Sequence, residues 1–265
     1  MNNVKVNDYK KKTIVRYSEI FLKGLNRGKF EKKLVDNIKI QTSLSSNNVQ
    51  NKRNRIILND WIDVANIFGI RNYSYVLECN ADEESIKHCI NEFIEMKKNN
   101  GSKIKKIRVT ANRLTKNFHL NSMEIQRKFG EYLFDKGFKV SLEDYDLNIY
   151  IEISDFAYVF VEKKKGLGGL PVGISGLVTI QINNEKDIKA AIMMMKRGCS
   201  VEVIASKFNK NMLKLSKYYP GQIKVVSERS KNSLSIVSGE DSINKLEKDK
   251  LYPLIGQIWS NSCSI

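Results

Sequence analysis

The chain has 265 residues and a mass of 30.5 kDa, a length that suits two or three small domains rather than one large core. Its apolar content of 42% and charged content of 28% are ordinary for a soluble protein, and no stretch approaches the roughly 18 consecutive apolar residues of a membrane span, so we expect no membrane protein. Residues 1–12 are polar and lysine-rich, without the apolar segment of a secretory signal, so we expect no secreted protein either. The net charge of +16 favours a polyanionic partner, chiefly nucleic acid, although the lysine bias of an AT-rich genome would also produce it.

The first part of the sequence alternates strand and helix signals. Residues 13–22 are rich in β-branched and aromatic side chains, which predicts a strand. A helix follows, with Phe30, Leu34 and Ile38 spaced by four on one face. The next predicted elements are a strand near Val49 or at 55–58, a short helix at 61–68 and a strand at 73–79. This β-α-β-α-β order predicts a ferredoxin-like α+β domain over residues 1–79.

A second predicted domain covers residues 80–175. Its elements are a helix over 82–97, a strand over 104–111, a helix from Asn121 or Ser122 to Gly137, and antiparallel strands over 140–153 and 158–161. The glycine-rich stretch 166–176 closes the domain and is typical of a linker or a turn.

Residues 176–265 form a third predicted domain of short apolar strands and helices. Strands are predicted at 178–182, 201–205, 223–226 and 234–237, with helices after the first two of them. This alternation predicts a parallel, doubly wound α/β sheet. The positive charge is concentrated in residues 1–79 and 176–265 and is nearly absent from 80–175, which favours a nucleic-acid surface over uniform compositional drift.

Two stretches of the sequence resemble a known family. Arg16–Arg27 reads RYSEIFLKGLNR, and Gly169–Gly176 reads GLPVGISG. Both resemble motifs of the tRNA 4-thiouridine synthases, sulfurtransferases that are also implicated in thiamine biosynthesis, and residues 116–130 and 158–162 are similar to further motifs of that family in the same order. The resemblance implies a ferredoxin-like N-terminal domain, a THUMP domain that receives the 3′ end of tRNA, and a Rossmann-like PP-loop domain, here truncated. A homodimer is also implied.

The positive side chains near these motifs are the predicted RNA contacts. Phosphate contacts position an RNA without reading its sequence, so cations clustered on a strand end, a turn and the following helix suit this role. A solvated helix face or strand edge is the alternative for each group. The predicted contacts are Arg16, Lys23, Arg27, Lys29 and Lys33 in the first domain, and Arg113, Lys116, Asn117, Lys163 and Lys164 in the second.

The loop at which this family binds ATP lacks its glycines. Active members have Ser-Gly-Gly-x-Asp-Ser after the first strand of the third domain, where backbone N–H groups and a helix N-terminus hold the pyrophosphate. Here the loop consists of Ile182, Asn183, Asn184, Glu185, Lys186 and Asp187. Its two carboxylates disfavour a phosphate, so we expect no ATP binding at this degenerate loop. Residues 238–242 (Ser-Gly-Glu-Asp-Ser) look like a PP-loop, but they follow the last strands rather than the first.

The cysteines and histidines show no catalytic or metal-binding pattern. The four cysteines are far apart, which indicates neither a disulfide framework nor a zinc site and fits the reducing cytoplasm. Cys199 is expected in the core, His88 and His119 are expected to be structural, and the sequence leaves open whether Cys263 carries sulfur. We expect no bound metal.

Two functions are compatible with these observations. The favoured one is a THUMP-type tRNA-binding protein that needs no cofactor and acts in tRNA modification, with a separate catalytic subunit as a possible partner. The alternative is an active tRNA sulfurtransferase that uses ATP to form 4-thiouridine. The altered loop favours the first, because adenylation of the uridine carbonyl requires ATP to be held closely.

Overall fold

The computed structural model describes residues 9–17, 19–52, 54–115, 118–205, 210–240, 247 and 249–254, with the backbone alone considered at 19 and 21–23. The chain divides into two compact units. The first unit comprises residues 1–14, 57–62 and 74–164, and the second comprises residues 15–56, 63–73 and 165–265. This grouping by compactness differs from the domain spans 1–79, 80–175 and 176–265, which stay a prediction.

The first unit is built on a mixed sheet. Strands β5 and β7 are parallel, whereas β7 and β4 both run antiparallel to β8. The sheet order is β2-β3-β1-β4-β8-β7-β5-β6, with β9 paired to β4. The strands are β1 (Tyr9–Arg16), β2 (Val49–Lys52), β3 (Arg55–Asn59), β4 (Asn72–Asn80), β5 (Lys106–Arg113), β6 (Lys139–Val140), β7 (Leu147–Ile153), β8 (Phe156–Phe160) and β9 (Lys164–Lys165). Of these, β2 lies in the second unit, and the residues of β1, β3, β4 and β9 are divided between the units.

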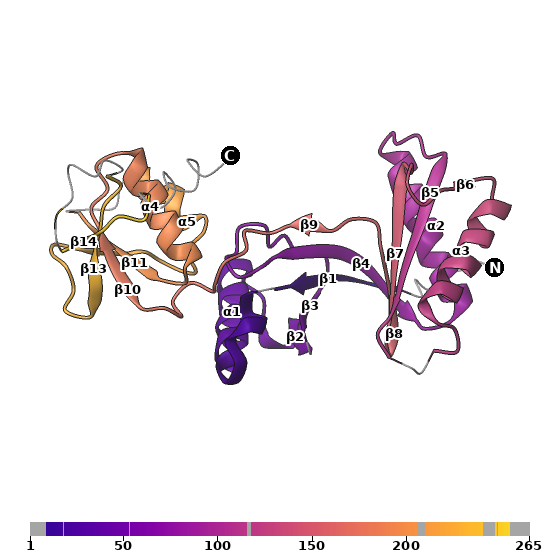
Figure 1. Ribbon diagram of the computed structural model, residues 1–265, viewed down its shortest axis with the longest axis horizontal. Coiled ribbons are helices and arrows are strands. Elements are labelled where there is room, and N and C mark those ends of the chain that lie inside the picture. Colours follow the sequence, from indigo (N-terminus) through magenta and orange to yellow (C-terminus); the bar gives the residue numbers. More distant parts are fainter. Residues whose placement is uncertain are drawn as a thin grey trace, which may run out of the picture. The chain divides into compact units, whose positions relative to one another are not determined.

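Helices α2 (Glu83–Asn99) and α3 (Ser122–Asp135) lie on the same face of this sheet (Figure 1). Their apolar residues pack on alternate positions of the strands, such as Ile107 and Val109 of β5, because successive strand residues point to opposite faces. Each helix begins at a side chain that accepts backbone hydrogen bonds. Asp82 caps α2, and Asn121 forms a capping box with Glu124 at the start of α3.

The second unit contains a five-stranded parallel sheet in the order β12-β11-β10-β13-β14. This confirms the predicted parallel sheet. Helices α4 and α5 pack on it, and their apolar side chains share one core with alternate residues of β10 and β11 (Figure 1). The elements are β10 (Leu177–Ile180), α4 (Glu185–Lys196), β11 (Ser200–Ile204), α5 (Lys210–Ser216), β12 (Lys224–Val226), β13 (Ser233–Val237) and β14 (Lys250–Leu251). The same unit holds α1 (Arg27–Thr42) and two 3-10 helices, Glu19–Asn26 and Ser46–Asn48.

The helix predicted at 61–68 is wrong. These residues form turns, in which side chains accept hydrogen bonds from the backbone in place of helical carbonyl groups. The Asp60 carboxylate accepts a hydrogen bond from the Trp61 N–H (2.7 Å), and Asp60 itself has a left-handed φ of 75°. Further along, the Asp63 carboxylate accepts from the Ala65 N–H (3.0 Å).

Two predicted strands are too long. The strand predicted at 13–22 ends at Arg16, and a 3-10 helix occupies Glu19–Asn26. Tyr17 and Ile20 are both buried at a spacing of three, which matches the period of a 3-10 helix. The strand predicted at 140–153 is interrupted between β6 and β7, where the Asp146 carboxylate accepts hydrogen bonds from the N–H groups of residues 105 and 106.

Candidate functional site

Arg27, a predicted RNA contact, is held in a hydrogen-bond network at the start of α1. Its guanidinium donates to the Glu31 carboxylate (2.6 Å), to the Asn54 side chain (2.6 Å) and to the Tyr17 hydroxyl (3.4 Å). Tyr17 in turn donates to Glu31. Burial, followed by the hydrogen bond to Glu31, raises the pKa of Tyr17 to about 12. The network fixes the position of the Arg27 cation on the second unit.

The other predicted contacts of this group lie nearby in the sequence. Arg16 at the end of β1 donates to the Asn72 side chain (3.5 Å). Lys29 is exposed on α1, whereas Lys33 is half-buried beside the glycine-rich stretch. A Cβ atom placed on Gly173 would lie 2.8 Å from Cε of Lys33, so glycine leaves room for the lysine stem. The Lys23 side chain lies outside the described residues.

Arg113 in the first unit organises the loop that leads to α3. Its side chain donates to the carbonyl oxygens of Phe118 (3.3 Å) and Leu120 (3.5 Å), and its backbone N–H donates to the Ser122 hydroxyl (2.9 Å). These contacts give Arg113 a structural role alongside any contact with RNA. Lys116 and Asn117 lie outside the described residues.

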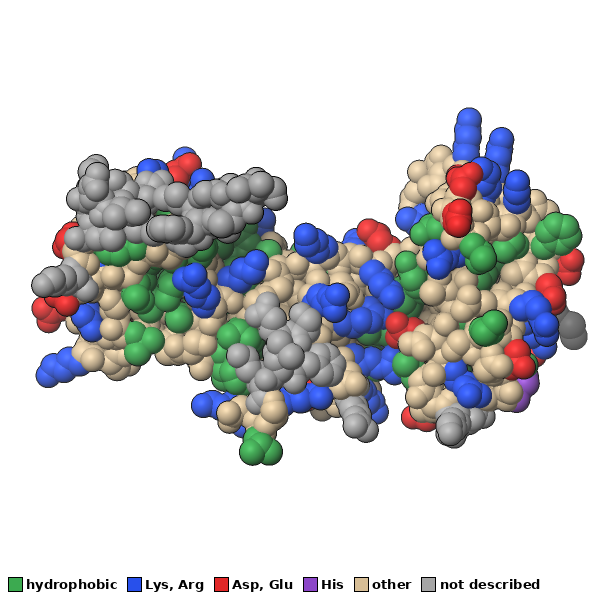
Figure 2. All heavy atoms as spheres, viewed as in Figure 1, with side chains coloured by type: hydrophobic (Ala, Val, Ile, Leu, Met, Phe, Trp, Pro, Cys, Tyr) green, Lys and Arg blue, Asp and Glu red, His purple; other side chains and the backbone are tan. Residues whose placement is uncertain are grey.

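Lys163 and Lys164 lie against aromatic rings. Nζ of Lys163 is 4.7 Å from the centre of the Tyr150 ring, and Nζ of Lys164 is 4.4 Å from the centre of the Tyr75 ring. Both distances are within the range of cation–π attraction. Lysine and arginine side chains are also spread over the surfaces of both units (Figure 2). The structure thus places the described members of the predicted RNA-contact set in two groups, one in each unit.

The predicted ATP loop lies at the point where the parallel sheet reverses its strand order. Neighbouring strands β10 and β13 both end there, and their chains continue in opposite directions through the sheet. In doubly wound sheets, ligands bind beyond the carboxyl ends of the strands at such a point. Residues 182–187 follow β10, and residues 238–240 follow β13. The sequence indicates residues 182–187 as the ATP loop of the family and argues against 238–242 because of their order in the chain, and the structure brings the two segments into contact.

The Asp187 carboxylate accepts the hydrogen bonds of the backbone N–H groups in this loop. Asp187 is only 5% exposed, and its Oδ2 accepts hydrogen bonds from the N–H groups of Asn183 (2.9 Å) and Asn184 (3.1 Å). Its Oδ1 accepts from the buried N–H of Gly239 (2.8 Å). The Asn184 side chain completes a capping box at the start of α4. Three backbone donors are therefore already paired within the protein.

Gly239 packs directly against the first turn of α4. A Cβ atom at this position would lie 2.2 Å from the carbonyl carbon of Lys186 and 2.3 Å from the backbone nitrogen of Asp187. Only glycine allows the two backbones to approach so closely. Ser238–Glu240 therefore closes over the loop, while residues 241 and 242 lie outside the described part of the chain.

The described residues offer no metal site, since they hold no cluster of three or more His, Cys, Asp or Glu side chains that could bind an ion. Cys79, Cys89 and Cys199 are buried thiols, as expected for Cys199, and Cys263 lies outside the described residues. None of the helices in the described part of the chain combines the length and apolar character needed to span a bilayer.

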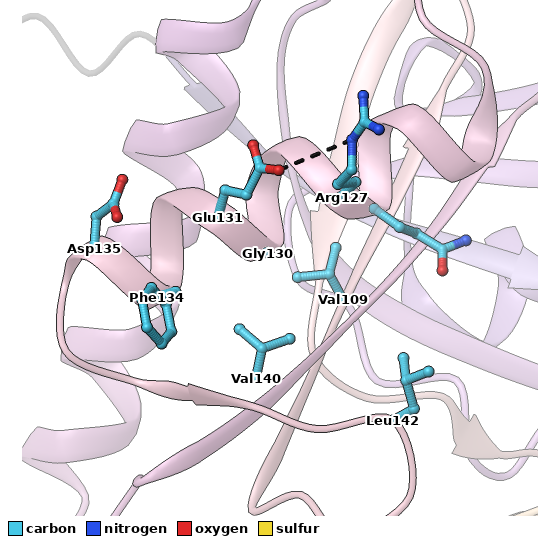
Figure 3. Close-up of a pocket in the computed structure, with 9 residues that line it drawn as sticks. Val109, Arg127, Gly130, Glu131, Phe134, Asp135, Val140 and Leu142 are labelled. Atoms are coloured by element: carbon cyan, nitrogen blue, oxygen red, sulfur yellow. Dashed lines mark ion pairs between the residues drawn. The ribbon is translucent and has the colours of Figure 1, made fainter.

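A pocket in the first unit lies between α3 and the edge strand β6, with a volume of about 390 Å³. Figure 3 shows Phe134, Val140 and Leu142 around it, with an ion pair between Arg127 and Glu131 (3.9 Å) at one side. Its lining is mostly apolar, and it holds none of the predicted RNA contacts.

Comparison with known proteins identifies two domains and a family. A family model described as the ThiI ferredoxin-like domain matches residues 12–74, and a THUMP domain model matches residues 80–162. A probable tRNA sulfurtransferase of Clostridium perfringens is 34% identical over 72% of this chain and 52% of its own length. A probable tRNA sulfurtransferase of Thermococcus kodakarensis is 32% identical over 89% of this chain and 66% of its own length. This chain is a THUMP-domain relative of the tRNA sulfurtransferases.

Solved structures agree with this assignment. The Pyrococcus horikoshii protein PH1313 superposes on this THUMP protein with a TM-score of 0.79 at 29% identity, covering 95% of this chain and 99% of that one. A 4-thiouridine synthetase, crystallised with RNA and bound ATP, superposes with a TM-score of 0.67 at 25% identity, covering 79% of this chain and 57% of that one. The THUMP protein spans about half the length of the Clostridium relative that it matches.

The sequence analysis missed a second cluster in the THUMP protein, formed by Trp61, Tyr75 and Phe93 with neighbouring lysines. The sequence places Trp61 in the predicted helix at 61–68, Tyr75 in the predicted strand at 73–79, and Phe93 on the apolar face of the predicted helix at 82–97. The alternation of Tyr73 and Tyr75 on one strand, followed by lysines at 163–165, was the available signal.

Proposed function

We propose that this protein binds tRNA and acts in tRNA modification. The single observation that carries the proposal is the pairing, in this order, of a ThiI ferredoxin-like domain with a THUMP domain. A structural relative, a 4-thiouridine synthetase, was crystallised as an RNA complex with bound ATP. The net charge of +16 supports a polyanionic partner.

The proposed RNA contacts are the ten residues predicted from the sequence. Arg27 supports this assignment because its guanidinium is fixed by Glu31 and Asn54, so little side-chain entropy would be lost when it meets a phosphate. Lys29 supports it through its exposure on the same helix. Arg113 fits less well as a direct contact, since it already donates to two carbonyl groups.

We further propose that the loop after β10 does not bind ATP. A pyrophosphate would need the N–H groups of Asn183, Asn184 and Gly239, and the Asp187 carboxylate has taken all three. A pyrophosphate that displaced the Asp187 carboxylate from these N–H groups would place its own negative charges beside those of Asp187 and Glu185. The residues present therefore do not fit the nucleotide, and the proposed role is binding rather than adenylation.

The alternative is that the protein is itself a tRNA sulfurtransferase. The observation in its favour is the name carried by the relatives that it matches. Under the binding proposal, a separate catalytic subunit supplies the chemistry in the cytoplasm, and two copies of this chain form a dimer. Light scattering of the purified protein, alone and with tRNA, measures whether that dimer exists.

Salt-dependent tRNA binding tests the main proposal. Affinity should fall steeply with salt, because each phosphate contact releases counterions. Charge reversal of Lys23, Lys29 and Lys116 together should weaken binding and reduce the slope of log K against log salt by about two to three units. The matched control reverses Lys103, Lys139 and Lys231, three exposed lysines outside the proposed contacts. An absent salt slope, or equal losses in both triple variants, would contradict the assignment.

Calorimetry with ATP separates the two candidate functions. At millimolar ATP, with and without magnesium, the protein should give no saturable heat, and it should form no 4-thiouridine when supplied with tRNA, ATP and a sulfur donor. An intact tRNA sulfurtransferase run in parallel shows that the assay works. A saturable isotherm, or thiolated tRNA formed by this chain alone, would establish the alternative.

A further inference from the structure

A second pocket in the first unit combines aromatic walls with a positive rim. It has a volume of about 230 Å³ and lies between β4, the end of α2 and the segment after β8. Phe93 is its most buried aromatic residue at 5% exposure, whereas Asn100 and Glu162 are exposed at its edge. The pocket lies at the end of α2, whereas the Arg113 loop lies near its start. Of the residues predicted above to contact RNA, only Lys164 lines the pocket.

The aromatic walls are arranged in a stack. The Trp61 and Tyr75 rings lie 5.8 Å apart at an angle of 25°, and the Trp61 and Phe93 rings lie 6.2 Å apart at 22°. The indole N–H of Trp61 donates to the Val76 carbonyl (3.0 Å), which fixes the orientation of the ring. A planar aromatic ligand would therefore meet rings that are already aligned, at little entropic cost.

Two lysines lie over these rings. Nζ of Lys164 is 4.4 Å from the centre of the Tyr75 ring, and Nζ of Lys11 is 4.9 Å from the centre of the Trp61 ring. An exposed cation–π contact contributes about 0.5–1 kcal/mol, whereas a nucleobase stacked on an aromatic side chain contributes about 1–3 kcal/mol. A base can thus displace the flexible lysine side chains, whose ammonium groups then remain close to its phosphate.

We propose that this pocket takes one unpaired nucleotide of a bound RNA, with the base against Trp61 and Tyr75 and the phosphate beside Lys11 and Lys164. This inference rests on the proposed RNA-binding function and adds a stacking site to it. The Glu162 carboxylate and the carboxyl end of α2 repel phosphate, so the base edge rather than the backbone faces them. A carboxylate accepts hydrogen bonds from exocyclic amino groups, which favours adenine, cytosine or guanine over uracil.

Tryptophan fluorescence reports on this pocket directly. The chain has two tryptophans, so the Trp259→Phe variant leaves Trp61 as the only indole. A six-nucleotide oligoadenylate should quench its emission in a saturable way. An abasic ribose-phosphate strand of the same length should not quench it, and oligouridylate should bind more weakly. A free mononucleotide offers the same base and phosphate as one nucleotide of an RNA, and adenosine monophosphate tests this alternative. If it quenches the emission as strongly as the oligomer does, the assignment to RNA is overturned.

Variants of the pocket keep the inference separate from the general proposal. Tyr75→Leu, made in the Trp259→Phe background, should weaken oligoadenylate binding by about 5-fold to 150-fold, the equivalent of one lost stacking contact. Lys103→Gln, at an exposed position outside the pocket, should leave it unchanged. If tRNA and oligoadenylate bind, but binding does not change the Trp61 emission and Tyr75→Leu does not change the affinity, the proposed stacking site is wrong while the proposed RNA-binding function stands. If neither RNA binds at low salt, the proposed function itself fails.

Discussion

Replacing Asp187 with alanine removes one acceptor that serves three backbone donors. Two of the donors, the N–H groups of Asn183 and Asn184, belong to the start of α4, and the third is the N–H of Gly239, which lies 52 positions further along the chain. The carboxylate therefore joins the loop after β10 to the loop after β13. Its loss should destabilise both the beginning of the helix and the junction between the two loops.

The magnitude of the effect can be worked out from these contacts. Asn184 remains as the N-cap, so Asp187→Ala removes only the N3 half of the capping box, which costs at most the roughly 1 kcal/mol of a full cap. The Gly239 N–H is buried, and a buried donor left without an acceptor costs about 1–3 kcal/mol. The two costs together predict that Asp187→Ala lowers the free energy of unfolding by about 1–4 kcal/mol. The Asp187→Asn variant keeps one acceptor oxygen, so its free energy of unfolding should lie between those of Asp187→Ala and the wild type.

Urea unfolding combined with hydrogen exchange measures this prediction. Circular dichroism gives the free energy of unfolding, and exchange at the Gly239 amide reports the junction between the loops. The matched control is Glu185→Ala, which removes a carboxylate from the same helical turn, where it is exposed and forms an ion pair with Lys214. That control should leave stability nearly unchanged. Equal stability of the two variants, with Gly239 still protected in Asp187→Ala, would refute the proposed junction.

Other contacts give three further predictions. A Cβ at Gly169 would lie 2.3 Å from the Lys196 carbonyl oxygen, whereas one at Gly168 meets nothing within 4 Å, and both have positive φ. Gly169→Ala should therefore cost about 1–3 kcal/mol more than Gly168→Ala in thermal unfolding, and equal costs would contradict the close approach. Because the pKa of Tyr17 is raised to about 12 from an ordinary value near 10, its stabilisation is present below pH 10 and is lost as the pH rises towards 12. Tyr17→Phe should reduce the loss of stability between pH 10 and pH 12. If stability falls with pH as steeply in this variant as in the wild type, Tyr17 is not the group responsible. Burial alone would raise the pKa of Glu202, but hydrogen bonds from Ser230 and Thr179 outweigh it and hold the pKa below its ordinary value. The stabilisation by Glu202 should therefore be lost as the pH falls through this lowered pKa, and a Glu202→Gln variant with the same acid unfolding curve as the wild type would exclude it.

The regular elements were predictable wherever burial alone determines the pattern. Ile125, Phe129 and Leu133 are spaced by four and are all buried on α3, and the parallel sheet followed from the alternation of short strands and helices. The prediction failed at 61–68, where apolar residues at helical spacing are held in turns by the carboxylates of Asp60 and Asp63. Short-range hydrogen bonds of this kind leave little trace in a hydrophobic pattern.

The candidate site was predictable in part. The sequence predicted the degenerate ATP loop after β10 and drew attention to residues 238–242 after β13, although their order in the chain argued against a PP-loop there. It assigned the Asp187 carboxylate only a repulsive effect on phosphate. Its role as an acceptor depends on Gly239, and the role of Arg27 depends on Asn54, which lies 27 positions away. Hydrogen-bond partners so distant in the sequence are brought together by tertiary packing, which cannot be read from the pattern of neighbouring residues. The stack of Trp61, Tyr75 and Phe93 was missed for the same reason.

The internal acceptor at Asp187 has a thermodynamic consequence for the second unit. A ligand that binds only the folded state stabilises it by RT ln(1 + [L]/Kd), so a compound that does not bind adds no stability. Under the proposal that this loop binds no ATP, the melting temperature of the second unit should be the same at any concentration of ATP, because the three backbone donors are already paired within the chain.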